Sequence, residues 1–219
     1  MTPAVSVLLT TYNRPGMLRE AVDSVLGQTM TGFELIILDD NSSDPQQWDV
    51  LRTACQDWRT VLYRSNVQPA ERPLTVRYAA LANIGLKLAR GRYVTYLCDD
   101  DLYLPERLEV MSRRLDEGDC QVVYGSQRCE RGGNVVLMRY AHQVLASASQ
   151  VVDHSSVMHT AAAAADAGGW DEDPSRWRDA DAVFWDRLTA AGHLFHPVPE
   201  VTDVHRFHAG SVSEAGVPA

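Results

Sequence analysis

The sequence has few of the features that mark secreted or membrane-spanning chains. Its four cysteines form no CxxC pair and have no close histidine partner, so we expect ordinary reduced thiols rather than disulfides. No apolar run approaches the roughly 18 residues of a membrane span, so no transmembrane segment is expected. The N-terminus also lacks the basic region of a signal peptide. We therefore expect a cytoplasmic chain.

Positive charge is scarce as well. The chain carries 20 Lys and Arg against 29 Asp and Glu, which gives a formal net charge of −9. A sequence-independent grip on nucleic acid or on an anionic membrane needs a surplus of basic side chains, so neither partner is expected. If this acidic protein binds a phosphate, a local group must supply the positive charge.

Low-complexity linkers and internal repeats are also missing. With 45% hydrophobic and 22% charged residues, the chain is neither disordered nor fibrous. A chain of 219 residues buries roughly 70% of its unfolded surface on folding, which suffices for one domain without disulfides or a structural metal. We expect a single domain over residues 1–219.

Short apolar runs alternate with helical patterns in the first half. Strands are expected at Val5–Leu9, Phe33–Leu38, Val61–Tyr63 and Tyr93–Leu97. Helices are expected from Pro15 to Gly27, over Trp48–Trp58 and Val76–Leu88, and from Pro105 to Leu115. This alternation predicts an α/β, Rossmann-like fold, with a mainly parallel sheet and helices on both faces.

The second half has a different pattern. Val122–Tyr124 and Val135–Met138 flank a predicted hairpin turn at Gly132 and Gly133. Helices are predicted over Ala161–Ala167 and Asp181–Leu188, and His205–Ser213 is expected to be a polar tail. We interpret this half as the second lobe of the same domain.

Polar clusters follow three of the predicted strands. They are Thr10–Asn13, Asp39–Asn41 and Asp99–Asp101. Because ligands of such sheets bind beyond the carboxyl ends of the strands, we expect the three clusters to lie on one rim. Three adjacent carboxylates repel one another unless they are solvated or share a cation. A solvated turn and a site for Mg²⁺ or Mn²⁺ that bridges to a diphosphate are both compatible with this cluster.

The ordered motifs resemble the inverting family 2 glycosyltransferases of GT-A fold, including the bacterial spore-coat polysaccharide synthesis glycosyltransferase. The similar segments are Val5–Arg14, Leu38–Asp44, Glu71–Arg72, Arg77–Leu81, Cys98–Leu108, Asp153–His159, and Asp181 with Phe184 and Trp185. They extend over nearly the whole chain. The spore-coat enzyme has Asn at the position of Asp101, so the share of metal contacts between Asp100 and Asp101 is open.

The resemblance implies a donor site on the rim. Thr10 and Tyr12 would hold the nucleotide base, with the Tyr12 ring stacked on a pyrimidine. Asp40 would accept a hydrogen bond from the ring N–H of uracil or thymine, and Arg72 would approach the base from the other side. Asp99 would bind the ribose. The donor is therefore expected to be a UDP- or dTDP-linked sugar.

The resemblance also implies a metal and a general base. Mn²⁺ or Mg²⁺ would be held by Asp100 and Asp101, and His208 would complete its shell or contact the diphosphate. Asp181 would deprotonate the acceptor hydroxyl in an inverting transfer, in which one base and one metal suffice. Asp179 and Asp186 lie on the same stretch, so an ordinary surface carboxylate is the competing interpretation of Asp181.

Acceptor recognition is expected in the second half of the chain. Residues 1–117 would form the nucleotide-binding half and residues 118–219 the acceptor-binding half, with Asp153, His154 and His159 on the acceptor side. Since the sequence ends soon after Ser213, we expect no membrane anchor. The part that selects the acceptor is expected within residues 118–219 or on a partner subunit, as in a homo-oligomer.

Three other functions compete with glycosyl transfer. A sugar-nucleotide pyrophosphorylase would need a glycine-rich loop after the first strand, where this chain has Tyr12–Pro15. A dinucleotide-dependent oxidoreductase would need GxGxxG after a strand, and the sequence has none. A nucleotide-sugar-binding protein without catalysis stays open as an alternative, although Asp100 and Asp181 argue against it.

Overall fold

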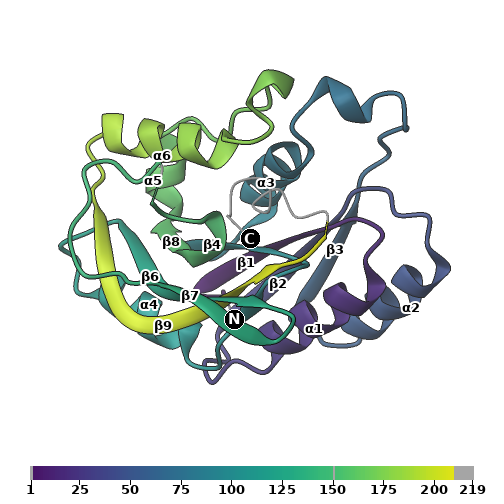
Figure 1. Ribbon diagram of the computed structural model, residues 1–219, viewed down its shortest axis with the longest axis horizontal. Helices are drawn as coiled ribbons and strands as arrows, with labels where there is room; N and C mark the ends of the chain where they lie inside the picture. The colour runs from purple at the N-terminus through teal and green to yellow at the C-terminus, as the bar shows by residue number, and fades with distance from the viewer. Residues whose placement is uncertain (1, 150, 210–219) are drawn as a thin grey trace.

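The computed structural model describes residues 2–149 and 151–209, and within them nine strands form one sheet (Figure 1). The strand order is β3-β2-β1-β4-β8-β6-β9-β5, and β7 pairs with β6. The strands are β1 (Val5–Thr11), β2 (Phe33–Asp39), β3 (Thr60–Arg64), β4 (Tyr93–Cys98), β5 (Leu102–Tyr103), β6 (Val122–Arg131), β7 (Asn134–Arg139), β8 (Val157–Thr160) and β9 (Phe195–Phe207).

Helices cover both faces of this sheet, as the sequence predicts. They are α1 (Pro15–Leu26), α2 (Pro45–Ala54), α3 (Arg77–Leu88), α4 (Arg107–Asp116), α5 (Ala161–Asp166) and α6 (Ala180–Ala190). Figure 1 shows α3, α5 and α6 on one face and α1, α2 and α4 on the other. The sheet therefore separates two apolar cores. Gly85 of α3 permits close packing, because a Cβ there would lie 2.8 Å from Leu8 and 2.9 Å from Leu38.

The first half of the sheet is parallel, which confirms the prediction from the βα alternation. Strand β1 pairs in parallel with β2 and β4, and β2 pairs in parallel with β3. In this register Thr11 lies opposite Asp39, and Thr10 lies opposite Cys98. The residues that follow β1, β2 and β4 consequently meet at one edge of the sheet.

The second half is mixed rather than mainly parallel. Strand β8 is antiparallel to both β4 and β6, and β9 runs parallel to β6 and antiparallel to β5. The predicted hairpin between β6 and β7 is confirmed, with Gly132 and Gly133 in the left-handed region at φ 57° and 81°. Such φ values at consecutive residues are what tight hairpin turns require.

Three predicted boundaries were wrong. His205 is not in a polar tail: it lies in β9, which reaches Phe207, and residues 210–213 of the predicted tail lie outside the described part. Helix α2 begins at Pro45, where Asp44 caps it, and it ends at Ala54, which leaves Trp58 outside and 80% exposed. Helix α4 begins at Arg107 rather than at Pro105.

Two expectations about composition can be compared with the structure. Cys55, Cys98, Cys120 and Cys129 all lie in the described ranges and are free thiols. Among residues 2–149 and 151–209, no helix has both the length and the apolar character needed to cross a membrane.

Candidate functional site

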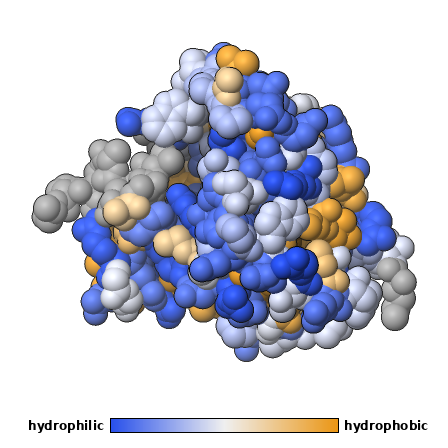
Figure 2. Space-filling model, turned by 90° about the vertical axis from the view of Figure 1, so that its right-hand side faces the viewer, coloured by the Kyte–Doolittle hydropathy of each residue, from blue (hydrophilic) through white to orange (hydrophobic). Residues whose placement is uncertain are grey.

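The three polar clusters meet at the carboxyl edge of the parallel strands. The Thr11 hydroxyl donates to Asp99 Oδ2 at 2.7 Å, and the Tyr12 N–H donates to the same oxygen at 3.2 Å. Asn13 joins the rim to the segment after β2, because its Oδ1 accepts from the N–H of Ser43 at 2.8 Å. The sequence prediction of one shared rim is therefore confirmed. Figure 2 shows that the face at the right-hand side of Figure 1 is predominantly hydrophilic, with scattered hydrophobic patches.

Two asparagines fix the backbone of this rim. Asn13 and Asn41 adopt positive φ values of 51° and 61°, a conformation that asparagine tolerates better than most residues. Both side chains are used locally: Asn13 as above, and Asn41 Nδ2 donates to the carbonyl of Val67 at 2.9 Å. The turns after β1 and β2 are thus pinned to the segments beside them.

Asp40 lies between two arginines. Arg77 Nη2 donates to Asp40 Oδ1 at 2.6 Å, and Arg72 Nη1 donates to the Asp40 carbonyl at 2.9 Å and forms an ion pair with Asp40 Oδ2 at 2.8 Å. Arg72 also places its guanidinium carbon 3.6 Å from the centre of the Tyr12 ring. The structure therefore brings Tyr12, Asp40 and Arg72 together, as the predicted base site requires. Arg77 was not assigned to this site, although its segment belongs to the motif that suggested the family.

Thr10 and Asp99 lie on the same rim. The Thr10 hydroxyl is 3.6 Å from Cys98 Sγ, and Asp99 is buried beneath the turn that follows β1. Burial and the neighbouring Asp100 carboxylate raise the pKa of Asp99 to about 6, against the opposing effects of its hydrogen bonds and of Arg14. A ribose hydroxyl could donate a hydrogen bond to the Asp99 carboxylate, which Thr11 and Tyr12 hold in place.

Asp100 contacts Arg14, which it shares with Asp99, and His208. Its Oδ2 lies 2.9 Å from Arg14 Nη1 and 3.0 Å from His208 Nε2. Arg206 donates from Nε to the Asp100 carbonyl and pairs with Glu20. The predicted pair of Asp100 and His208 is therefore close enough to share a ligand. An imidazole and a carboxylate are suitable donors for Mn²⁺.

Asp101 is turned away from Asp100, into the interior. Its carboxylate accepts from Ser155 Oγ at 2.8 Å and from the Arg206 N–H at 3.0 Å, and His205 Nδ1 lies 3.2 Å away. Asp101, Asp153 and His205 place one ligand atom each within 4.8 Å of one another, which is a spacing that can hold a metal ion. Although burial opposes protonation, Asp101 and Asp153 raise the pKa of His205 to about 9.

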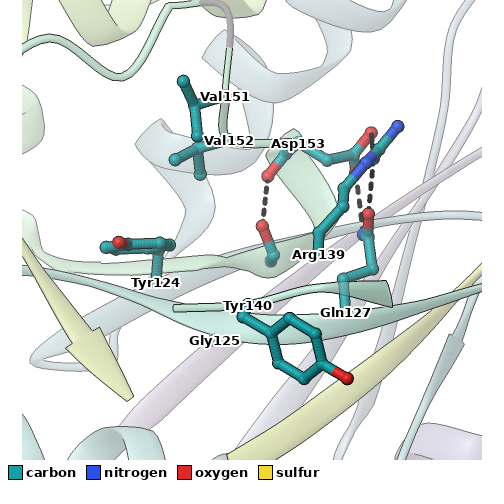
Figure 3. Close-up of a pocket in the computed structure, with 9 residues that line it drawn as sticks. Tyr124, Gly125, Gln127, Arg139, Tyr140, Val151, Val152 and Asp153 are labelled. Carbon is teal, nitrogen blue, oxygen red and sulfur yellow. Dashed lines mark hydrogen bonds and ion pairs between the residues drawn. The ribbon is translucent and has the colours of Figure 1, made fainter. Parts of the chain in front are cut away.

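Asp181 lies at the start of α6 and lines one of two pockets that have Arg139, Val151, Val152 and Asp153 in common. One has a volume of about 250 Å³, and its lining includes Asp153, Arg178 and Asp181. The other has a volume of about 320 Å³ and is shown in Figure 3. Burial raises the pKa of Asp181 above its ordinary value, with His154 opposing and Asp153 reinforcing the shift. A carboxylate with a raised pKa beside a cavity is suited to accept a proton.

The larger pocket is polar at one end and apolar at the other. Arg139 Nη1 donates to Gln127 Oε1 at 2.6 Å, and it lies 3.8 Å from Asp153 Oδ2. Figure 3 shows these three side chains gathered at one end, with Tyr124 and Val152 at the other. Sequence analysis assigned no role to Arg139 and Gln127. Both residues lie just outside the apolar runs from which the hairpin was predicted, so the sequence carried no signal for them.

The three residues predicted on the acceptor side are placed differently. Asp153 lines both pockets, and His154 lies near it with its Nε2 3.2 Å from Cys98 Sγ. His159, by contrast, is fully buried and packs against Phe184 of α6 rather than lining either pocket. Its two ring nitrogens are within 2.7 Å of the Tyr96 hydroxyl and 2.8 Å of the Thr160 carbonyl. His159 is a hydrogen-bonded core residue.

Known proteins resemble this chain in sequence. A family model described as glycosyl transferase family 2 matches residues 6–163. Protein CgeD of Bacillus subtilis (strain 168) is 39% identical over 214 residues, which cover 93% of this chain and 50% of that protein. The chain therefore spans about half the length of this curated relative.

Solved structures resemble it in fold. S. aureus TarS 1-349 in complex with UDP-GlcNAc matches 97% of this chain and 61% of its own, with a TM-score of 0.74 and 17% sequence identity. The mannosyltransferase PcManGT from Pyrobaculum calidifontis, in complex with GDP-Man and Mn²⁺, matches 98% of this chain and 60% of its own, with a TM-score of 0.70 and 15% identity. At such identities the similarity carries information about the fold alone.

Proposed function

Because this chain belongs to glycosyl transferase family 2 and has the GT-A fold, we propose that it transfers a sugar from a nucleoside diphosphate sugar to an acceptor hydroxyl with inversion. The observation that carries the proposal is the convergence of four side chains on one rim, namely Tyr12, Asp40, Asp99 and Asp100. Asp181 lines a pocket formed by the second half of the chain. We assign residues 1–117 to the donor and residues 118–219 to the acceptor.

The donor base is assigned to the group of Tyr12, Asp40 and Arg72. Tyr12 is 39% exposed and offers an aromatic face, and Asp40 offers carboxylate oxygens to a ring N–H. Uracil and thymine both carry that N–H, so we propose a UDP- or dTDP-linked sugar. The UDP-GlcNAc complex of TarS supports the uridine donor by analogy of fold.

The donor's cation is assigned to Asp100 and His208. Asp100 Oδ2 and His208 Nε2 are 3.0 Å apart, and a carboxylate with an imidazole is a ligand pair that fits a divalent cation. The contact of Arg14 with the same carboxylate supports this assignment, because the position attracts positive charge. Mn²⁺ or Mg²⁺ bound there would supply positive charge to the leaving diphosphate. Asp101 fits the donor's cation less well, because its carboxylate is buried and turned away from Asp100 toward Ser155, His205 and the Arg206 N–H.

Asp181 is assigned the role of general base. Its carboxylate takes the proton of the acceptor hydroxyl while the hydroxyl oxygen forms a bond to the anomeric carbon. The bond from that carbon to the diphosphate breaks on the opposite face, and its electron pair leaves with the diphosphate. Burial raises the pKa of Asp181, which strengthens it as a base.

The acceptor is assigned to the two pockets that share Arg139, Val151, Val152 and Asp153. Their lining combines apolar side chains with hydrogen-bonding groups, which suits a hydroxyl-bearing molecule with both polar and apolar faces. The competing function, nucleotide-sugar binding without catalysis, predicts donor binding with no turnover.

The proposal is tested by a thermal unfolding panel with UDP, dTDP and GDP, each with and without Mn²⁺. We expect UDP or dTDP to raise the unfolding temperature only when Mn²⁺ is present, because binding to the folded state stabilises it by mass action. GDP serves as the mismatched nucleotide. If none of the nucleotides binds in the presence of Mn²⁺, the donor site is wrong. Donor hydrolysis or transfer with UDP-sugars then separates an enzyme from a binding protein.

A further inference from the structure

Arg14 bridges two carboxylates of the proposed donor site. Its Nη1 lies 3.2 Å from Asp99 Oδ1 and 2.9 Å from Asp100 Oδ2. The side chain of Arg14 is 38% exposed, whereas those of Asp99 and Asp100 are 5% and 17% exposed. A partly exposed cation therefore covers two largely enclosed anions.

The Arg14 bridge offsets the repulsion between two neighbouring carboxylates of the rim. Asp99 and Asp100 are adjacent in sequence directly after β4, and two carboxylates so close repel each other. Burial lowers the pKa of Arg14, but the charges of Asp99 and Asp100 outweigh it, so the guanidinium stays protonated. Arg14 is thus the local positive group that a protein of net charge −9 needs at a phosphate site.

The backbone of Arg14 is fixed while its side chain can turn. Its N–H donates to Gln47 Oε1 at 3.2 Å, and the residue stands directly before Pro15, where α1 begins. Four side-chain torsions separate this anchored backbone from the guanidinium. Arg206, which also lies beside Asp100, is held by Glu20 and by the carbonyl of Asp100. Arg14 is therefore the rim cation whose partners are the two carboxylates themselves.

We propose that Arg14 holds the place of the donor's cation on Asp99 and Asp100 in the ligand-free protein and turns to the diphosphate when a divalent cation takes Asp100. This inference rests on the proposed function. A guanidinium suits the second position as well, since its planar fork matches phosphate oxygens. Arg14 would then compete with the metal before the donor binds and cooperate with it afterwards.

The two roles predict opposite effects of one substitution. In Arg14→Met, without nucleotide, Mn²⁺ should bind about fivefold more tightly, because a half-exposed ion pair no longer competes for Asp100. At saturating Mn²⁺, UDP should bind about tenfold more weakly, because a charge-assisted contact to phosphate is lost. Free Mn²⁺ is measured by electron paramagnetic resonance, and UDP binding by calorimetry. Arg14→Lys should give smaller changes of the same signs.

Arg19→Met is the matched control. Arg19 is exposed on α1, the helix that follows Arg14, so this variant removes an equal charge and has no ion pair with Asp99 or Asp100 to break. Both affinities should stay at the wild-type values. Thermal unfolding verifies that each variant is folded.

The outcomes separate the inference from the proposed function. If Arg14→Met and Arg14→Lys leave Mn²⁺ affinity unchanged or weaken it, Arg14 does not hold the cation's place. If UDP affinity at saturating Mn²⁺ is unchanged, Arg14 does not move to the diphosphate. Either result overturns the inference while the wild type still binds UDP with Mn²⁺. If the wild type does not bind UDP with Mn²⁺, the proposed function itself fails.

Discussion

The guanidinium carbon of Arg72 lies 3.6 Å from the centre of the Tyr12 ring, which is the geometry of a planar cation stacked on an aromatic face. The same guanidinium reaches Asp40 Oδ2 at 2.8 Å. The three residues assigned to the nucleotide base therefore already contact one another through Arg72, which stacks on Tyr12 and pairs with Asp40. A pyrimidine that stacks on this face of Tyr12 and donates its ring N–H to Asp40 has to displace Arg72 from at least one of these contacts.

Tyr12→Ala should weaken UDP binding by roughly 1–2 kcal/mol, about five- to thirtyfold in affinity, because the aromatic surface for stacking is lost. Calorimetry with UDP and Mn²⁺ measures the change. Tyr140→Ala is a suitable comparison, since Tyr140 is 65% exposed and lines the pocket assigned to the acceptor. Equal UDP affinity in wild type and Tyr12→Ala would remove Tyr12 from the base site.

Asp100→Ala and Asp101→Ala should fail in different ways. Asp100 faces Arg14 and His208 at the rim, so its loss should abolish Mn²⁺-dependent UDP binding with little change in the unfolding temperature. Asp101 is buried and pairs with His205, so its loss should cost about 3 kcal/mol of stability, because the buried imidazolium of His205 loses its nearer carboxylate and keeps Asp153, which lies 3.8 Å away. Urea unfolding and UDP titration measure the two effects. Identical profiles for the two variants would contradict this division of roles.

The parallel half of the fold was predictable from sequence because its signals are local. Strands β1, β2 and β4 are apolar runs that end directly in polar turns, and the parallel pairing then places those turns on one edge. The rim follows from this chemistry without any knowledge of long-range contacts. The sequence does not predict which side chain each rim carboxylate contacts. Asp101 is an example, because it continues the Asp99–Asp100 run but faces His205.

The second half depends on contacts that sequence patterns do not encode. Strand β9 contains Pro197 and Pro199 and shifts its register against β6, so no alternating pattern identified it and His205 was expected in a tail. His159 belonged to a motif with Asp153 and His154, yet it points into the core, where Tyr96 satisfies it. A histidine's sequence neighbours do not indicate to which face of a strand it points.

Asp181→Asn should remove turnover and leave UDP affinity unchanged, because the amide keeps the shape of the side chain and cannot accept the acceptor's proton. Asp186→Asn, on the exposed side of the same helix, should keep wild-type turnover. The raised pKa of Asp181 also predicts that turnover falls on acidification at a higher pH than an ordinary aspartate would cause, since the base must be ionised. Release of the nucleoside diphosphate, followed across pH, measures both effects. Turnover that survives in Asp181→Asn would assign the base elsewhere.

His159 should make the protein sensitive to acid. Burial lowers the pKa of His159 to about 4, with the Thr160 carbonyl opposing and His193 reinforcing the shift, while the unfolded chain has the ordinary value of about 6.5. Between these values the unfolded state binds a proton that the folded state does not, so stability present above pH 6.5 is lost as pH falls toward 4. The loss from this residue should approach about 3 kcal/mol.

Urea unfolding near neutral pH and near pH 4 measures this loss in wild type and in His159→Gln. Glutamine can still hydrogen-bond to Tyr96 but does not titrate, so the variant should lose less stability on acidification even if it is less stable at neutral pH. His142→Gln, at an exposed histidine, should retain the full acid sensitivity of wild type. The same acid loss in His159→Gln and in wild type would mean that other groups, such as paired carboxylates, govern the acid response.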